Sequence, residues 1–240
     1  MPISNPAPIR LLIHGASGRM GQTLLKLAAE RDDLRIVAAV APPSEDAELL
    51  GQPFHPVADL DGVPAFDVAI DFSLPAAFDA ILDLCARRGA AFVSGTTGLS
   101  APQRTALQSA ASAIPALWSA NFSLGVAVLE ELVERAASAL SGWDCDIVEA
   151  HHTRKLDAPS GTALALGAAA DRGGADPRYA SLRAGDIVGE HLVQFAGLGE
   201  RIELIHRATS REIFARGALH AAARLGGRSA GLYRLRDLLD

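Results

Sequence analysis

A continuous apolar run at 9–13 (IRLLI), followed at once by a glycine-rich segment, constrains the fold of this chain more than any other feature. Strands that are buried on both faces of a parallel sheet show such unbroken apolar runs, whereas half-exposed strands alternate. Later runs of this kind alternate with segments of helical pattern, and strands alternating with helices form βαβ units. The expected strands are 9–13, 34–40, 68–72, 91–94 and 116–119, and the expected helices are 20–31, 76–88 and 102–113. We therefore predict an α/β fold with an N-terminal doubly wound parallel sheet.

The pattern changes after Asn121, where we place a domain boundary. Two partly alternating runs, 190–196 and 201–206, are separated by a Gly-Leu-Gly turn, which is typical of an antiparallel hairpin with one covered face. The other expected elements of this half are helices at 126–140, 162–170 and 210–225 and a strand at 146–151. The predicted domains are 1–121 for dinucleotide binding, 122–210 as an α+β domain for substrate binding and oligomerisation, and a tail, about 211–240, that returns to the first domain.

Charge and cysteine content exclude several classes of partner. A formal net charge of −6 disfavours nucleic acid or an anionic membrane, so a basic cluster in this chain suits a small anion. Cys85 and Cys145 are far apart and lack metal-ligand spacing, which is typical of reduced thiols in the cytoplasm. The N-terminal segment lacks the basic start of a signal peptide, and no apolar stretch approaches the roughly 20 residues of a membrane span. We expect a soluble, cytoplasmic protein.

The loop after the first expected strand, HGASGRMGQ, carries glycines in G-x-x-G-x-x-G spacing. Glycines allow a tight turn and a close approach of the backbone, and the helix N-terminus that follows offers free N–H groups to a pyrophosphate. An ordinary glycine-rich turn is the alternative, but the strand–loop–helix context makes the sheet Rossmann-like and favours dinucleotide binding. The candidate cofactor residues here are Gly15, Ala16, Ser17, Gly18, Arg19 and Met20.

Two further loops are candidates for the nicotinamide half of the cofactor. They follow the expected strands at 91–94 and 116–119, and ligands of open α/β sheets bind at the carboxyl ends of the strands. A plain βα turn explains the first of these loops equally well. The candidate residues are Gly95, Thr96, Thr97, Ser119, Ala120, Asn121 and Phe122.

A basic cluster, His151, His152, Arg154 and Lys155, stands just before a Pro-Ser-Gly-Thr segment at 159–162. Adjacent histidines at a strand end point to opposite sides and no cysteine or carboxylate lies at ligand spacing, so we expect no metal. Solvated surface charge is the simple alternative. However, Ser-Gly-Thr can begin a helix with exposed N–H groups, and cations beside a helix N-terminus bind a carboxylate or phosphate. A histidine there is a candidate proton donor, which indicates an anionic substrate that must be protonated.

The chain resembles the 4-hydroxy-tetrahydrodipicolinate reductase (dihydrodipicolinate reductase) family in segments that follow the family's order and span nearly the whole sequence. These segments are GASGRMG, DFS-x-P, SGTTG, ANFSLGV, EAHH-x-x-K-x-DAPSGTAL, RAGDIVGEH and HRATSREIFARGAL. The resemblance implies an N-terminal Rossmann domain and a C-terminal substrate domain that forms homotetramers. It also implies reduction of a cyclic dicarboxylate imine to tetrahydrodipicolinate with NADH or NADPH, in diaminopimelate and lysine biosynthesis.

The same resemblance implies roles at single positions. His151 corresponds to the family's proton-transfer histidine and Lys155 to its catalytic lysine, also assigned as a proton donor. His152 corresponds to a substrate-binding position, and Gly161 and Thr162 to residues that hold a substrate carboxylate. The residue chemistry agrees, because hydride addition to a conjugated carbon creates negative charge that a nearby imidazolium or ammonium can neutralise with a proton. The cofactor segments correspond to 15–20, 95–97 and 119–122.

Three positions depart from the family pattern. The second strand ends in Ala41-Pro42, where the family usually has an acidic residue, often followed by arginine. Because that acid normally contacts the adenosine ribose, the choice between NADH and NADPH stays open. Leu74 stands where some members have an arginine, and the segment 171–181 is shorter than usual, which we expect to alter the oligomer interface.

Three other functions compete with this interpretation. A related two-domain dehydrogenase of another amino- or oxo-dicarboxylate would share the N-terminal half, but the segment 149–166 favours the reductase. A cofactor-binding sensor without turnover would explain the missing ribose acid, although His151 and Lys155 argue against it. An enzyme that forms a Schiff base through Lys155 would give an imine that borohydride traps.

Overall fold

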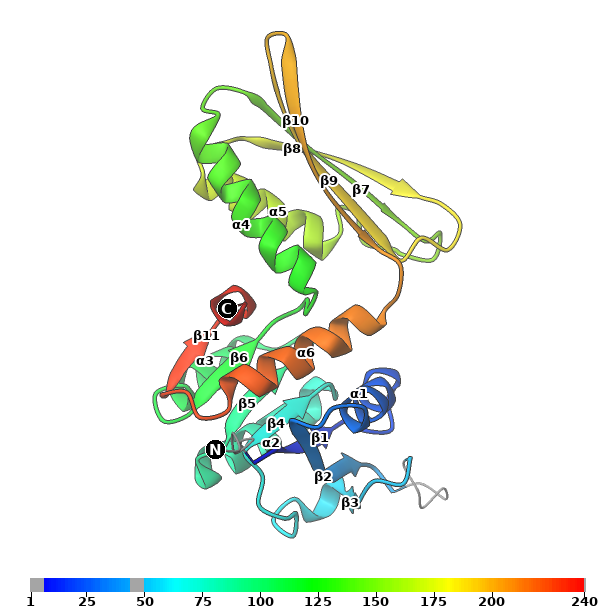
Figure 1. The fold of residues 1–240 in the computed structure, drawn as a ribbon, viewed down its shortest axis with the longest axis vertical. Helices are drawn as coiled ribbons and strands as arrows, with labels where there is room; N and C mark the ends of the chain where they lie inside the picture. Colours follow the sequence, from blue (N-terminus) through cyan, green and yellow to red (C-terminus); the bar gives the residue numbers. More distant parts are fainter. Residues whose placement is uncertain (1–6, 44–49, 240) are drawn as a thin grey trace, which may run out of the picture. The chain divides into compact units, whose positions relative to one another are not determined.

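The structure is a computed structural model that describes residues 7–43 and 50–239. The chain forms two compact units. Unit 1 comprises Met1–Phe122 together with Phe214–Asp240, and unit 2 comprises Ser123–Ile213. Figure 1 shows the elements of each unit along the chain. None of the helices in the described ranges is long and apolar enough to cross a membrane.

Unit 1 is built on a seven-stranded sheet in the order β11-β6-β5-β4-β1-β2-β3. All neighbouring strands run parallel. The chain moves from β1 to β2 on one side and from β4 through β5 to β6 on the other, so the predicted doubly wound parallel sheet is confirmed. The strands are β1 (Ile9–His14), β2 (Leu34–Ala41), β3 (Phe54–Pro56), β4 (Val68–Asp71), β5 (Ala91–Ser94), β6 (Pro115–Trp118) and β11 (Gly231–Tyr233).

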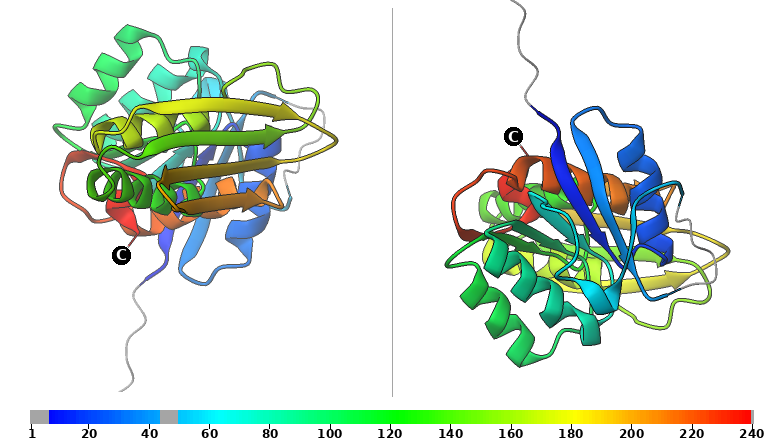
Figure 2. Two further views of the ribbon diagram at one scale, coloured as in Figure 1. Left: turned by 90° about the horizontal axis from the view of Figure 1, so that it is seen from above. Right: turned by 90° about the horizontal axis from the view of Figure 1, so that it is seen from below.

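Helices cover both faces of this sheet. The chain proceeds along the sheet in one direction after β1 and in the opposite direction after β4. Because βαβ crossovers are right-handed, the helices of these two halves lie on opposite faces of the sheet. Accordingly α1 (Arg19–Ala29) and α6 (Glu212–Leu225) lie on one face, and α2 (Pro75–Arg88) and α3 (Ala101–Ala110) lie on the other (Figure 2). Two short 3-10 helices, η1 (Val57–Asp59) and η2 (Leu235–Leu238), complete the unit.

Local sequence explains where these helices begin and end. α2 has Pro75 in its first turn and stops at Gly89, whose φ of 65° is the left-handed conformation that glycine adopts without strain. α3 begins with a capping box, in which Ser100 and Gln103 each bond the backbone N–H of the other. The predicted end of α2 at residue 88 is therefore confirmed.

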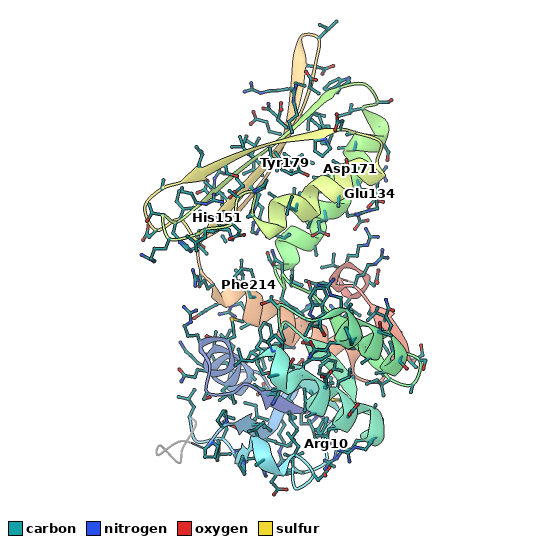
Figure 3. All side chains as sticks on the ribbon, turned by 180° about the vertical axis from the view of Figure 1, so that it is seen from behind. Arg10, Glu134, His151, Asp171, Tyr179 and Phe214 are labelled. Atoms are coloured by element: carbon teal, nitrogen blue, oxygen red, sulfur yellow. The ribbon has the colours of Figure 1, made fainter. Side chains whose placement is uncertain are left out.

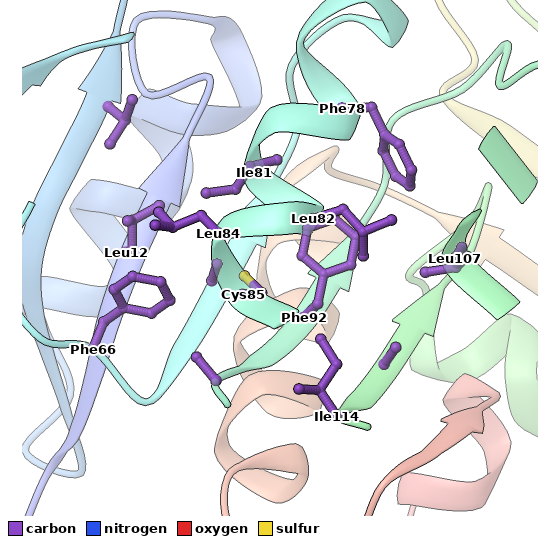
Figure 4. Close-up of a cluster of buried hydrophobic side chains, with 14 of the residues drawn as sticks. Leu12, Phe66, Phe78, Ile81, Leu82, Leu84, Cys85, Phe92, Leu107 and Ile114 are labelled. Carbon is purple, nitrogen blue, oxygen red and sulfur yellow. The ribbon is translucent and has the colours of Figure 1, made fainter. Parts of the chain in front are cut away.

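Aromatic and aliphatic side chains fill the space between the sheet and the two helices α2 and α3 (Figure 4). Phe78 of α2 and Phe92 of β5 are fully buried, with ring centroids 5.5 Å apart and planes inclined at 72°. This edge-to-face geometry is a favourable one for aromatic pairs. Leu12 of β1 and Ile114 before β6 extend the same cluster along the sheet, which fixes the strand ends that carry the site described below.

Unit 2 has a four-stranded sheet in the order β10-β9-β7-β8. β7 (Asp144–His151) pairs with β8 (Pro177–Arg183) in parallel and with β9 (Gly189–Gly197) antiparallel, and β9 pairs with β10 (Glu200–Ala208) antiparallel. Thus the expected hairpin is present. Helices α4 (Leu124–Ala139) and α5 (Gly161–Arg172) pack side by side on one face of this sheet (Figure 1).

Three strands were not predicted from the sequence. β8 follows α5 in a segment whose pattern is that of a connection, because its residues are mostly exposed and polar and show no apolar run. It is held by Tyr179, which packs so closely over α5 that a Cβ on Gly167 would stand 1.7 Å from the Tyr179 hydroxyl. β3 and β11 have three residues each, too few for a periodic pattern.

The core of unit 1 gives a stability prediction. Phe92→Ala is expected to lower the free energy of unfolding of this unit by about 3–5 kcal/mol, because it leaves a cavity beside Phe78. Urea titration would be followed through the fluorescence of Trp118 in a Trp143→Phe background. The control, Leu232→Ala, removes a side chain that is half exposed and is expected to have little effect. A loss below about 1 kcal/mol for Phe92→Ala would contradict this account of the core.

Candidate functional site

The glycine loop of unit 1 joins β1 to α1 with a tightly constrained backbone. Gly15 has φ +79°, and a Cβ there would meet the Phe72 carbonyl oxygen at 2.5 Å. A Cβ on Gly21 would meet the Gly15 oxygen at 2.2 Å, so the helix can approach the loop only because both residues are glycine. The N–H groups of Gly15 and Ala16 both donate to the Val40 oxygen at 3.0 Å, which ties the loop to the end of β2.

The start of α1 fits a pyrophosphate. Within the described part of the chain, no side chain caps the helix at its N-cap residue, Gly18. The first intrahelical hydrogen bond runs from the Gln22 N–H to the Gly18 oxygen, so the N–H groups of the preceding turn have no acceptor within the helix. Backbone donors at the positive end of a helix dipole bind phosphate groups. The loop 15–20 therefore has the form of the phosphate half of a dinucleotide site.

A buried carboxylate joins three strand ends beside this loop. His14, Asp71 and Ser94 are the last residues of β1, β4 and β5 and lie side by side in the sheet. The fully buried Asp71 carboxylate contacts His14 Nδ1 at 2.8 Å and accepts hydrogen bonds from the hydroxyls of Ser73, Ser94 and Thr96 at 2.6, 2.8 and 2.7 Å. Burial raises the pKa of Asp71, but the bonds from His14, Ser73 and Thr96 outweigh it and hold the pKa below its usual value.

The other predicted cofactor residues lie at the same edge of the sheet of unit 1. Gly95 lets its loop lie against an aromatic ring, because a Cβ there would meet Phe72 Cε1 at 2.2 Å. The Ser119 N–H donates to the Ser94 oxygen at 3.1 Å, and the buried Phe122 ring stands 5.5 Å from that of Phe72. The structure thus brings the segments 15–20, 95–97 and 119–122 to one sheet edge, which is the arrangement expected of a dinucleotide site.

Unit 2 holds the predicted proton-transfer histidine against a second buried carboxylate. His151, the last residue of β7, contacts the Glu149 Oε2 atom through Nδ1. Arg183 donates to both oxygens of Glu149, from Nη1 at 3.0 Å and from Nη2 at 2.7 Å. Burial raises the pKa of Glu149, but hydrogen bonds from Arg183, Ser181 and His151 prevail and lower it to about 2. Burial lowers the pKa of His151 despite the opposing effect of Glu149.

Lys155 lies in the loop that follows β7. Its Nζ atom is 2.8 Å from the Asp157 carboxylate, and its side chain is about one-fifth exposed. The Asp157 carbonyl oxygen accepts from Arg183 Nη2 at 2.6 Å. His152 points elsewhere, with Nε2 3.3 Å from Nη2 of Arg211. The structure therefore links the predicted catalytic pair, His151 and Lys155, and sets a cation beside His152.

The predicted carboxylate-binding residues begin α5. Ser160 is the N-cap residue, and its hydroxyl accepts from the Ala163 N–H at 3.2 Å. Gly161 and Thr162 occupy the first two helical positions, at the positive end of the helix dipole. Apart from Gly161, its chain neighbours and the backbone of its own helix, no atom of the described residues would come within 4 Å of a Cβ built at this position. This open helix start can receive a carboxylate.

The residues that surround His151 have no role predicted from the sequence. The rings of His151 and His191 lie 5.2 Å apart, and His191 Nε2 is 3.2 Å from the Ser160 hydroxyl. Burial, followed by the nearby His151 and His206, lowers the pKa of His191 to about 4. Glu149 could have been found, because residues two apart on a strand share a face. Arg183 and His191 lie on other strands, and although both belong to the RAGDIVGEH segment of the family resemblance, nothing in that segment places them beside His151.

The residues that the structure describes offer no set of donor atoms for a metal ion. They contain no group of three or more His, Cys, Asp or Glu side chains that could hold an ion.

A doubly wound sheet with a dinucleotide edge, combined in one chain with a unit that carries proton donors, defines a nicotinamide-dependent oxidoreductase. Models for the N-terminus and the C-terminus of dihydrodipicolinate reductase match residues 9–122 and 125–239. The chain belongs to the dihydrodipicolinate reductase family.

Individual relatives agree with this assignment. The 4-hydroxy-tetrahydrodipicolinate reductase of Stenotrophomonas maltophilia (strain R551-3) is 70% identical over 98% of this chain and 100% of its own length. That of Xanthomonas campestris pv. campestris (strain B100) is 64% identical over 97% of this chain and 98% of its own. A dipicolinate-bound dihydrodipicolinate reductase from Paenisporosarcina sp. TG-14 has the same fold, with a TM-score of 0.81 and 21% identity over 96% of this chain and 99% of that one.

The Asp71 network gives a prediction for cofactor binding. Asp71→Asn is expected to weaken binding of NADH or NADPH at least about tenfold, because an amide cannot accept from all the donors and leaves buried groups unpaired. Asp67→Asn is a matched control, since Asp67 precedes the same strand but pairs with Arg10 at the exposed opposite end. Fluorescence titration of the cofactor measures both variants. Equal affinities for the two variants would contradict the assigned role of Asp71.

Proposed function

We propose that the chain catalyses NADH- or NADPH-dependent reduction of 4-hydroxy-tetrahydrodipicolinate to tetrahydrodipicolinate, a step of diaminopimelate and lysine biosynthesis. The observation that carries the proposal is the grouping, in one unit, of the His151–Glu149 pair, Lys155 and the open start of α5. That grouping suits an anionic substrate that must receive a proton. Relatives of 64–70% identity that bear the reductase name support the same reaction.

Each unit contributes different parts. In unit 1 the segments 15–20, 95–97 and 119–122 would hold the cofactor, which supplies the hydride when bound. In unit 2 the N–H groups of Gly161 and Thr162 bind one substrate carboxylate, and His152, beside Arg211, binds the substrate as well. Two anionic groups on a small ring match these separate donors, so the substrate is a small cyclic dicarboxylate.

His151 and Lys155 supply the proton. The overall change adds a hydride and a proton to the substrate and releases water. Because Nδ1 of His151 faces Glu149, the proton leaves from Nε2, beside which Gly189 has no side chain. The low pKa of His151 makes its proton easy to release, and a bound dicarboxylate favours the charged ring before transfer. Lys155, linked to the same cluster through Asp157, is the second donor.

The open face of the unit 2 sheet supports a homotetramer. Val148, Leu192 and Ile205 form a row across β7, β9 and β10 on the face opposite α4 and α5, and Ala180 of β8 extends it. A second sheet can cover such an apolar row. The two cysteines are buried and unbonded, which suits a cytoplasmic location.

Turnover tests the catalytic assignments. His151→Ala and Lys155→Ala are each expected to lower kcat about 100-fold or more, because each removes a proton donor, while the Kd of the cofactor stays nearly unchanged. Arg154→Ala is the matched control, since Arg154 is an exposed cation in the same loop. Oxidation of NADH and of NADPH would be followed by absorbance with enzymatically generated substrate. Parental turnover in His151→Ala would refute its role, and no oxidation of either cofactor by the parental chain would refute the reductase proposal.

Oligomeric state tests the open face. The parental chain is expected to have the mass of a tetramer in light scattering, and Ile205→Arg is expected to have a smaller mass, because it places a charge in the apolar row. Leu132→Arg, on an exposed position of α4, is the control and is expected to keep the parental mass. A monomeric parental chain would rule out the assembly.

A further inference from the structure

We infer that Glu149 and Arg183 are positioning residues. They fix one tautomer of His151 and hold the loop that carries Lys155 at a constant position relative to His151. This inference rests on the proposed function, because it assigns roles around the proposed proton donors. Neither residue is required to touch the substrate. Together they would determine which nitrogen of His151 delivers the proton and where the second donor stands.

Glu149 determines the tautomer. It lies two residues before His151 on β7, so both side chains point to the same face of the sheet. Its ionised carboxylate can only accept hydrogen bonds, so the hydrogen of the neutral His151 ring must be on Nδ1. In the neutral ring the lone pair is then always on Nε2. In the charged ring the proton that can be transferred is the one on Nε2. Carboxylates that orient a histidine in this way are a general device of proton-transfer sites.

Arg183 immobilises the carboxylate. It stands on β8 directly beside His151 in the parallel register and donates to both oxygens of Glu149. A forked pair of bonds fixes the plane of the carboxylate as well as its position. The Glu149 carboxylate therefore has no freedom to rotate away from the ring.

Arg183 also connects the second donor. Its Nη2 atom donates to the Asp157 carbonyl oxygen at 2.6 Å, and the Asp157 carboxylate holds Lys155 Nζ at 2.8 Å. The backbone adds a bond from the Ala184 N–H to the His151 oxygen at 2.9 Å. One guanidinium thus joins the end of β7 to the loop that carries Lys155, so the two donors keep a fixed separation.

Four groups from different elements face the His151 ring. They are Glu149 on β7, Arg183 on β8, His191 on β9 and Lys155 in the loop. The carboxylate of Glu149 stabilises the charged ring, whereas Arg183 and Lys155 oppose it. Removing the negative charge of Glu149 therefore lowers the pKa of His151. Activity that requires the charged ring is lost as pH rises through that pKa, so the alkaline limb of kcat moves to lower pH.

Glu149→Gln tests the pair through kinetics. We expect kcat to fall about 10- to 100-fold, its alkaline limb to move to lower pH, and the KM of the substrate and the Kd of the cofactor to change less than about threefold. In a His151→Ala background the same substitution is expected to cause no further loss of kcat, because Glu149 acts through that ring. Additive losses, or an unmoved alkaline limb, would overturn the inference.

Arg183→Lys tests the forked bond. Lysine keeps the positive charge but cannot bond both Glu149 oxygens and the Asp157 carbonyl in one plane. We expect a loss of kcat comparable to that of Glu149→Gln, and a nearly unchanged KM for the substrate, which unit 2 binds, serves as the check that this unit has folded. Glu134→Gln is the matched control, because Glu134 also accepts from an arginine, Arg172, but lies well apart from His151 in unit 2 (Figure 3). Parental kcat in Arg183→Lys would remove Arg183 from the inference.

A measurement without turnover separates this inference from the proposed function. Long-range ¹H–¹⁵N NMR of histidine-labelled protein reports the tautomer of His151, whose signals are assigned by their loss in His151→Ala. At high pH the parental chain is expected to show the Nδ1–H form. In Glu149→Gln the Nε2–H form is expected to gain population, since an amide cannot satisfy all the donors that Glu149 accepts. A parental Nε2–H form overturns the inference even if the reductase is active, and inactivity with the Nδ1–H form overturns only the proposed reaction.

Discussion

A carboxylate stays charged in a protein interior only where fixed donors surround it, and each unit of this chain is organised around one such group. In unit 1 Asp71 joins the ends of three parallel strands and so sets the spacing of the loops that follow them. In unit 2 Glu149 joins the end of β7 to Arg183 of β8. Both are side chains at or near strand ends, where a rigid sheet meets a functional loop. The cofactor edge and the proton donors thus depend on the same physical arrangement, although they lie in different units.

Much of the fold could be predicted because burial leaves a periodic record in the sequence. Strands such as β1 and β5 are buried on both faces and appear as unbroken apolar runs. Helix α2 ends just before Gly89, as its helical pattern predicts. β8 left no such record. Its residues are mostly exposed, and it is held by pairing with β7 and by one close contact between Tyr179 and α5. A strand that is defined by its neighbours cannot be found from its own composition.

The site residues also divide into those that the sequence could predict and those that it could not. The segments 15–20 and 151–162 could be assigned because each packs its chemistry into a short stretch with its own turn and helix start. Their supports could not, because they come from distant parts of the chain that only the sheet register brings together. Arg183 is 34 residues from Glu149, and Thr96 is 25 from Asp71. The family resemblance located the motifs that contain these residues and assigned Thr96 to a cofactor segment, but it attached no role to Glu149, Arg183 or Asp71. Their roles follow from which atoms donate and which accept.

The parallel pairing of β8 with β7 has a consequence for how this chain tolerates insertions and deletions. Side chains alternate between the two faces of a strand, so a shift of one residue in β8 would turn Arg183 away from Glu149 and onto the open face. The turn between the end of α5 at Arg172 and the start of β8 at Pro177 faces no such restriction. Length variation in this region is therefore more easily accommodated in the turn than within the strand. A shortened connection can coexist with an intact site if the pairing of β8 with β7 keeps Arg183 beside His151.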